Sequence, residues 1–349
     1  MTHRINYIDR MKGMAILFVV IGHIFMFSME QSSNVAAQVI YAFHMPLFMF
    51  LSGIVAAKGI TPPIWSIRKL LSKILALLLP MMVFGGIFSL TLGPTEDFAD
   101  FCMSILSFVN APAKNGYWYL MTLAMFYLSM QFFRLNRCES GIVDVILAVA
   151  TWAVFLAGWK FSAQRIDPFC LLNCGNFYLF FILGVFTTKY ELLPKLEERN
   201  WLLTAGMAGF LFFFLYTFPI HAMQSVVRHI LLPFCALLVV VYLFLRRKND
   251  TSFVERQLEY IGRNTLDIYV LHYFFVANIN IEAAGRWMGE SGNGFLAFVA
   301  AAALSVAVTY LSIAAGRMLH ASHAVNRFVY GRDIFGKEKE QQTVSQLIN

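Results

Sequence analysis

Long apolar stretches recur along the whole chain, and short polar segments separate them. Ten of these stretches come close to the roughly 17 to 25 residues that a helix needs to cross a hydrocarbon core of about 30 Å. The predicted spans cover residues 13–29, 39–57, 74–92, 118–133, 142–158, 173–188, 201–218, 229–245, 261–281 and 295–316. The pattern therefore predicts an all-α, polytopic integral membrane protein with about ten transmembrane helices. We expect one transmembrane domain over residues 1–330 and a short polar cytoplasmic tail over residues 331–349.

Composition and charge agree with this pattern. The chain is 59% hydrophobic and 13% charged, whereas a soluble domain carries about 25% charged residues. Cytoplasmic loops retain Lys and Arg, and with ten spans the outer segments hold only Lys114, Lys160, Arg165, Arg228 and Arg286. The other 22 of the 27 basic residues then lie in inner segments, which predicts that both termini are cytoplasmic. Because the net charge of +7 follows this insertion rule, and no basic stripe with interleaved aromatics occurs, we expect no nucleic-acid partner.

Two features near the ends of spans bear on processing and redox chemistry. The first stretch runs into Ser28, Met29 and Glu30 without a small-residue cleavage site, so we interpret it as a retained helix. Cys170 and Cys174 lie close together near the outer end of the sixth span. A disulfide and a pair of buried thiols are both compatible with this position.

Polar residues inside the first span are the strongest candidates for function, because a central charge costs roughly 2.5 to 3.5 kcal/mol on insertion. His23 follows Lys12 by 11 residues, which at about 100° per residue places both on one helix face, about 16 Å apart. Glu30 follows by another seven residues and is expected on the same face. The alternatives are a packed imidazole for His23, an interfacial position for Glu30 and the insertion rule alone for Lys12.

Two further spans carry histidines. His44 enters from the outer side and is expected near the depth of His23, while Ser52 and Gly53 in the same span are expected to pack against another helix. His272 of the ninth span is expected near the midplane. Asp267 lies about 140° around the helix from His272, so we expect it to pair with Arg263 near the inner boundary instead.

Four motifs resemble the acyltransferase family 3 membrane proteins, and within them the branch of fucose 4-O-acetylase-like enzymes. They are YIDRMKGMAILFVVIGH at residues 7–23, FHMPLFMFLSG at 43–53, NGYWYL at 115–120 and IGRNTLDIYVLH at 261–272. The first is similar to the family's opening motif, in which a basic residue and a helix His are separated by ten residues, here Lys12 and His23. Many family members have Arg at the position of Lys12, and Lys lacks the planar fork for a bidentate phosphate contact.

The resemblance implies an O-acyltransferase of a bacterial-type inner membrane. It would move an acetyl group from cytoplasmic acetyl-CoA to a hydroxyl of a cell-envelope glycan or related sugar, without a metal; succinyl transfer stays open. His23 would act as general base, or as a nucleophile through an acyl-imidazole, and His44 or Glu30 would orient it or relay the proton.

The remaining site residues follow from the same resemblance. Phosphate groups of coenzyme A would bind the inner basic residues Lys12, Arg68, Lys69 and Lys73, although the insertion rule alone also accounts for these positions. The acceptor would contact Trp118, Tyr119 and His272, although the two aromatic residues also fit an interfacial belt. The competing class is a transporter that moves a solute or proton along the same polar stripe. It commonly requires inverted repeats, which the sequence lacks. A membrane scaffold would leave three mid-membrane histidines without a purpose.

Overall fold

The computed structural model describes residues 6–57, 66–92, 98–112, 116–136, 139–161, 166–217 and 220–332. Over these residues the protein is helical and contains no strand. The first half comprises α1 (Asn6–His23), η1 (Ile24–Ser28), α2 (Val35–Ala56), α3 (Ile67–Leu92), α4 (Phe98–Asn110), α5 (Trp118–Ser129), η4 (Met130–Leu135), α6 (Gly141–Phe161) and α7 (Leu171–Lys189). The second half comprises α8 (Leu192–Glu197), α9 (Trp201–Leu215), α10 (His221–Val226), η5 (Val227–Leu231), α11 (Leu232–Arg246), α12 (Phe253–Arg263), α13 (Thr265–Val276), α14 (Glu282–Glu290), α15 (Gly294–His320) and α16 (His323–Phe328).

Within the described ranges, seven helical segments are long and apolar enough to cross a membrane. They are Asn6–Ser28, Val35–Ala56, Ile67–Thr91, Gly141–Lys160, Leu171–Lys189, Met223–Arg246 and Gly294–His320. Shorter apolar helices occupy Phe98–Asn110, Trp201–Leu215 and Thr265–Val276. The predicted all-α, polytopic membrane class is therefore confirmed. The count of ten spans and the cytoplasmic termini stay predictions, and residues 333–349 of the predicted tail lie outside the described residues.

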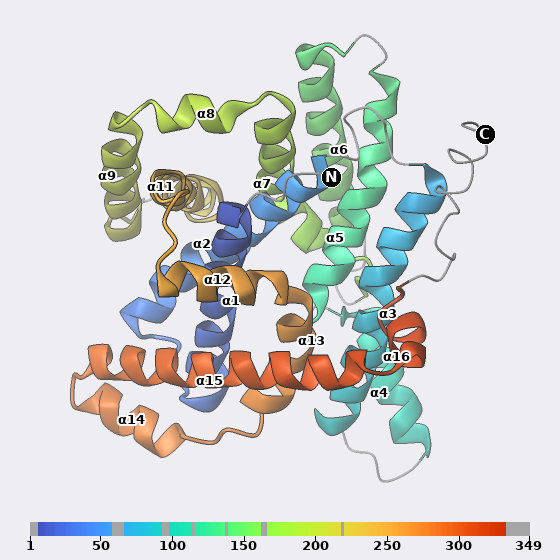
Figure 1. The fold of residues 1–349 in the computed structure, drawn as a ribbon, viewed down its shortest axis with the longest axis vertical. Coiled ribbons are helices and arrows are strands. Elements are labelled where there is room, and N and C mark those ends of the chain that lie inside the picture. Colours follow the sequence, from blue (N-terminus) through green and yellow to red (C-terminus); the bar gives the residue numbers. More distant parts are fainter. Residues whose placement is uncertain are drawn as a thin grey trace, which may run out of the picture.

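Helices α1, α12 and α13 lie at the centre of the fold (Figure 1). Helices α8, α9 and α11 lie on one side of them and α3 to α6 on the other, while the long α15 runs across one end with α14 beside it (Figure 1). Because α1 carries His23 and α13 carries His272, this central position surrounds both histidines with protein.

Close crossings of glycine faces join the central helices. A Cβ on Gly13 of α1 would collide with the Leu258 carbonyl of α12, and a Cβ on Gly262 of α12 would collide with the Asp9 carbonyl. Gly53 of α2 approaches the α7 backbone in the same way, as expected for its span. Small residues let helix backbones approach this closely in a membrane, where hydrophobic burial gives helices no reason to associate.

The first span does not continue as a regular helix past His23. A π-helical segment, η1, follows directly, and the Met29 N–H donates to the Ile24 carbonyl at 2.9 Å. The helix ends there, and Glu30 has a left-handed backbone with φ 53° and an exposed side chain. The expectation that Glu30 shares the helix face of His23 is therefore wrong, because the 100° spacing holds only for an unbroken α-helix.

The ninth predicted span is broken at Asn264, between α12 and α13. Its Asp267 pairs with His320 at the end of α15, 2.9 Å from carboxylate to ring nitrogen. Arg263 instead pairs with Glu259 and lies 3.9 Å from Asp9. The predicted pair of Asp267 with Arg263 is wrong, because the helix break separates them and each finds a partner on another element or turn.

Another buried carboxylate, Asp144 of α6, is compensated at the end of α7. It accepts hydrogen bonds from Lys189, from the Tyr190 hydroxyl at 2.6 Å and from Asn136 at 2.7 Å. Burial, together with the bond to this carboxylate, raises the pKa of Tyr190 to about 12. Cys170, directly before α7, and Cys174, in the first turn of α7, are buried thiols that no disulfide joins.

Candidate active site

His23 and His272, from α1 and α13, form a direct pair. The His23 Nδ1 lies 2.8 Å from the His272 Nε2, and the two rings are parallel within 8°. His272 is fully buried, whereas His23 forms part of a cavity wall. The structure thus joins two histidines that the sequence separates by 249 positions.

Hydrogen-bond partners define the tautomers of this pair. The His272 Nδ1 lies 2.9 Å from the Ile268 carbonyl, which can only accept, so this nitrogen carries the hydrogen. The His272 Nε2 of the neutral ring is then an acceptor, and His23 must donate to it from Nδ1. The Nε2 of His23 is left with its lone pair, which is the form of imidazole that removes a proton.

Tyr273 of α13 contacts the Nε2 of His23, and the Gly116 carbonyl before α5 binds two tyrosines of α13. The Tyr273 hydroxyl lies 3.2 Å from the His23 Nε2 and 3.4 Å from the Gly116 carbonyl, so its single proton can go to either acceptor. Tyr269 donates to the same carbonyl at 2.8 Å. Gly116 has φ +81°, and a Cβ there would collide with the Tyr273 ring. Glycine at this position therefore allows the carbonyl to serve both tyrosines.

A cavity of about 840 Å³ opens beside His23. Aromatic, amide and basic side chains of α1, α2, α5, α7, α13 and η5 form much of its wall, and none of the described residues on this wall is Asp or Glu. The wall includes His23, His44, Trp118, Tyr269 and Tyr273. Its size and mixed polarity suit an organic ligand, since ligand sites occupy roughly 300 to 1,000 Å³.

The predicted acceptor and relay residues divide between this wall and its surroundings. His44 lines the cavity and donates from Nδ1 to the Ile40 carbonyl at 2.8 Å. Trp118 lines it too, stacked on Phe177 with 5.2 Å between ring centroids. Tyr119 and His272 lie behind the wall, and the Tyr119 hydroxyl bonds Ser52 at 2.7 Å. Glu30 is exposed beyond the end of η1 and is not among the described residues of the wall.

The predicted coenzyme A contacts lie away from this cavity. Lys12 is half-buried and forms an ion pair with Asp9 at 3.4 Å. Arg68 and Lys69 are exposed in the first turn of α3, and Lys73 is half-buried one turn later. None of these four side chains lines the cavity wall. The cavity and this group of basic residues are therefore separate places in the structure.

Sequence reasoning missed Tyr273, Tyr269 and Arg10. The tyrosines flank His272 in the run Tyr269 to Tyr273, and their closeness in sequence to this histidine was the available signal. Arg10 was counted only among the inner cations, yet it is buried, lies 3.7 Å from Glu255 of α12 and donates to the Arg247 carbonyl at 3.1 Å. Charged residues thus help to hold α1 against α12.

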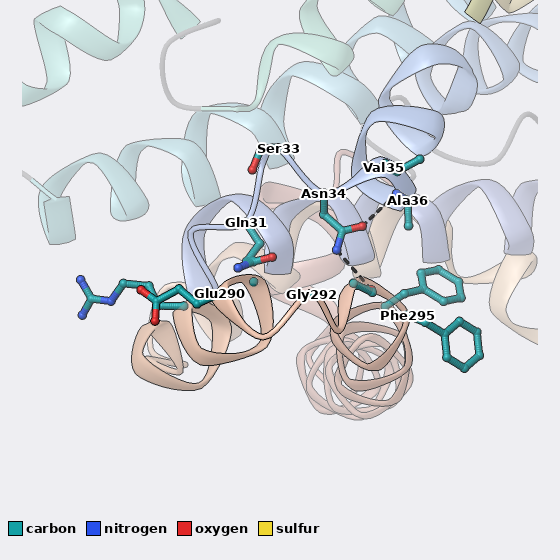
Figure 2. A pocket seen from close by; sticks show the side chains of 12 residues that line it. Gln31, Ser33, Asn34, Val35, Ala36, Glu290, Gly292 and Phe295 are labelled. Atoms are coloured by element: carbon teal, nitrogen blue, oxygen red, sulfur yellow. Dashed lines mark hydrogen bonds between the residues drawn. The ribbon is translucent and has the colours of Figure 1, made fainter. Parts of the chain in front are cut away.

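A second pocket of about 760 Å³ lies between the start of α2 and the region of α14 and α15 (Figure 2). The Asn34 side chain accepts from the Ala36 N–H at 2.9 Å and donates to the Gly294 carbonyl at 3.2 Å, as Figure 2 shows. Its described wall contains no histidine. The pocket beside His23 is therefore the better candidate for an active site, because it alone of the two offers an imidazole base.

The fold and this site define a helical, polytopic membrane protein with a histidine pair beside a cavity. Comparison with known proteins gives the family. The sequence pattern of a family described as an acyltransferase domain matches residues 5–314, and this protein belongs to that family, acyltransferase family 3.

One curated relative is similar over part of its length. It is the nodulation protein NolL of Sinorhizobium fredii (strain NBRC 101917 / NGR234), which is 28% identical over 181 residues. The matched region covers 46% of this chain and 49% of NolL, so the similarity spans about half of that relative's length. No solved structure matches the chain.

Proposed function

We propose that this protein is a membrane O-acyltransferase that moves an acetyl group from cytoplasmic acetyl-CoA to a hydroxyl of a cell-envelope glycan or related sugar. Membership of the acyltransferase family supports the reaction class. The observation that carries the proposal is the His23 Nε2, which has a lone pair at the cavity wall while His272 holds the opposite ring nitrogen at 2.8 Å. A base positioned in this way is what hydroxyl activation requires.

In the proposed reaction the His23 Nε2 removes the proton from the acceptor hydroxyl as its oxygen attacks the thioester carbon. The carbon–sulfur bond then breaks, and the departing thiolate takes the proton back from His23 to give coenzyme A and the O-acetyl ester. His272 accepts the Nδ1 hydrogen bond throughout and stabilises the imidazolium that forms between these steps.

Tyr273 controls access to the base in this scheme. When its hydroxyl donates to the Gly116 carbonyl, the His23 lone pair is open to the acceptor. A covalent route would use the same lone pair to attack the thioester directly. Rapid-quench trapping of labelled acetyl on the protein, without acceptor present, separates the two routes.

The two substrates approach from different sides in the proposal. Coenzyme A phosphates bind Lys12, Arg68, Lys69 and Lys73 on the predicted inner side, and the pantetheine arm spans the roughly 16 Å between Lys12 and His23. The acceptor enters the cavity, where the stacked Trp118 and Phe177 offer an aromatic surface. Lys12 then acts as a point charge without a bidentate fork.

Two measurements test the proposal. Isothermal titration of acetyl-CoA into the protein in lipid nanodiscs should show binding, whereas a permease for an unrelated solute should show none. Mass spectrometry of envelope glycans should find O-acetyl groups in cells with the wild-type gene and none with His23→Ala. His323→Ala, an exposed histidine of α16, is the matched control and should keep them. Unchanged acetylation with a stably expressed His23→Ala protein would overturn the proposal.

A further inference from the structure

A short π-helix, η5, places two basic side chains on the wall of the His23 cavity. Arg228 and His229 both lie on this wall, followed there by Leu232 and Pro233 of α11. Single-turn π-helices occur frequently at functional sites, because the wider turn redirects side chains out of the regular helix face. The cavity therefore has a basic group that neither the base nor the predicted coenzyme A contacts include.

Arg228 lines the cavity without a carboxylate partner in the described part of the chain, whereas three arginines elsewhere are paired. Arg10, Arg263 and Arg286 each have a carboxylate within 4.0 Å, and Arg286 pairs with Glu282 at 2.7 Å. Among the residues that the structure describes, no carboxylate lies within that distance of the exposed Arg228. Its guanidinium is thus available to a ligand in the cavity, and a planar fork of this kind favours carboxylate and phosphate groups.

Other parts of the same wall suit a sugar. Asn173 and Asn176 lie three residues apart on α7, and therefore on neighbouring positions of one helix surface. Amide groups both donate and accept hydrogen bonds, as sugar hydroxyls require. The Trp118 and Phe177 pair adds an apolar face on the same cavity. A ligand that uses all of these groups is a saccharide with a negative charge.

We infer that the acceptor is an anionic saccharide whose carboxylate or phosphate binds Arg228 while one of its hydroxyls faces His23. This inference rests on the proposed transferase function. It names the acceptor class and assigns Arg228 as a specificity-determining residue of the cavity wall. Because Arg228 contacts a part of the acceptor that does not react, its loss should raise KM for the acceptor and leave kcat unchanged.

The first test identifies the acetylated sugar. Mass spectrometry of glycans from cells with the wild-type gene should place the O-acetyl group on an acidic or phosphorylated sugar, or on the residue next to one. An acetylated oligosaccharide without any charge would overturn the inference and leave the transferase function intact. Absence of every gene-dependent acetyl group would instead remove the transferase function itself.

The second test combines a change at Arg228 with a change in the charge of the acceptor. It uses the isolated, deacetylated acceptor and the protein in zwitterionic nanodiscs. Arg228→Gln should raise KM about 10- to 100-fold, the effect of a lost hydrogen bond to a charged group. Neutralising the acceptor, by carboxyl reduction or phosphate removal, should raise KM for the wild type by a similar factor. The two changes together should cost no more than either one.

Matched controls exclude indirect effects. Arg286→Gln, in the second pocket, should leave KM unchanged because this arginine already pairs with Glu282. Arg228→Lys should recover part of the loss through charge alone. Fully additive effects of Arg228→Gln and acceptor neutralisation would overturn the inference. The inference would also be overturned if KM depended on anionic lipid in the nanodisc and not on the charge of the acceptor. That result would assign Arg228 to a lipid headgroup.

Discussion

Replacement of His272 by Leu tests whether the histidine pair works as a unit. His272 lies behind the cavity wall and accepts the Nδ1 hydrogen of His23 at 2.8 Å. Leucine removes this acceptor, so the Nδ1–H of His23 is left without a partner and the ring loses its preference for a lone pair at Nε2. An unsatisfied buried donor costs about 1 to 3 kcal/mol. If this cost falls on the transition state, kcat should drop about 5- to 160-fold, since 1.36 kcal/mol is tenfold in rate.

The assay follows release of the coenzyme A thiol from acetyl-CoA by purified protein with an envelope glycan extract as acceptor source. His272→Gln is the matched variant, because its amide oxygen can accept from Nδ1 near the place of the missing ring nitrogen, and it should keep activity within about tenfold of wild type. Thermal unfolding of both variants reports whether the fold survives. A His272→Leu protein with normal melting temperature and wild-type kcat would refute the orienting role of His272.

Three other substitutions test the surrounding structure. Gly262→Ala should lower the melting temperature and the activity together, because its Cβ meets the Asp9 carbonyl and overpacking costs about 1 to 3 kcal/mol. The control Gly86→Ala, whose Cβ would come no closer than 3.7 Å to Ile105, should change neither quantity. Equal effects of the two variants would contradict the close crossing. Lys189→Met should destabilise the fold by about 3 to 5 kcal/mol in thermal unfolding, because it leaves the Asp144 carboxylate buried without its cation. Lys195→Met, which removes an exposed lysine, is the control and should not show this loss. Tyr273→Phe should keep transfer within about tenfold, since it removes one neutral hydrogen bond; a loss as large as that of His23→Ala would mean that this hydroxyl takes part in the chemistry.

The apolar pattern by itself determined the helical membrane class, because the length and hydropathy of a span are local properties of the chain. It also identified His23 as a polar residue that insertion does not explain. Local spacing was sufficient up to His23, where α1 is a regular helix. It failed beyond that point, since nothing in the periodicity signalled the π-helical turn that directs Glu30 away.

Only the tertiary structure decided which polar residues meet. His23 and His272 are 249 positions apart, and their contact depends on the glycine crossing of α1 with α12 and on the break at Asn264. The sequence predicted Arg263 as the partner of Asp267, because no local pattern indicates that His320, 53 positions later, contacts it. Helix periodicity describes neighbours within a few turns, whereas the packing of separate helices places distant side chains around a common cavity.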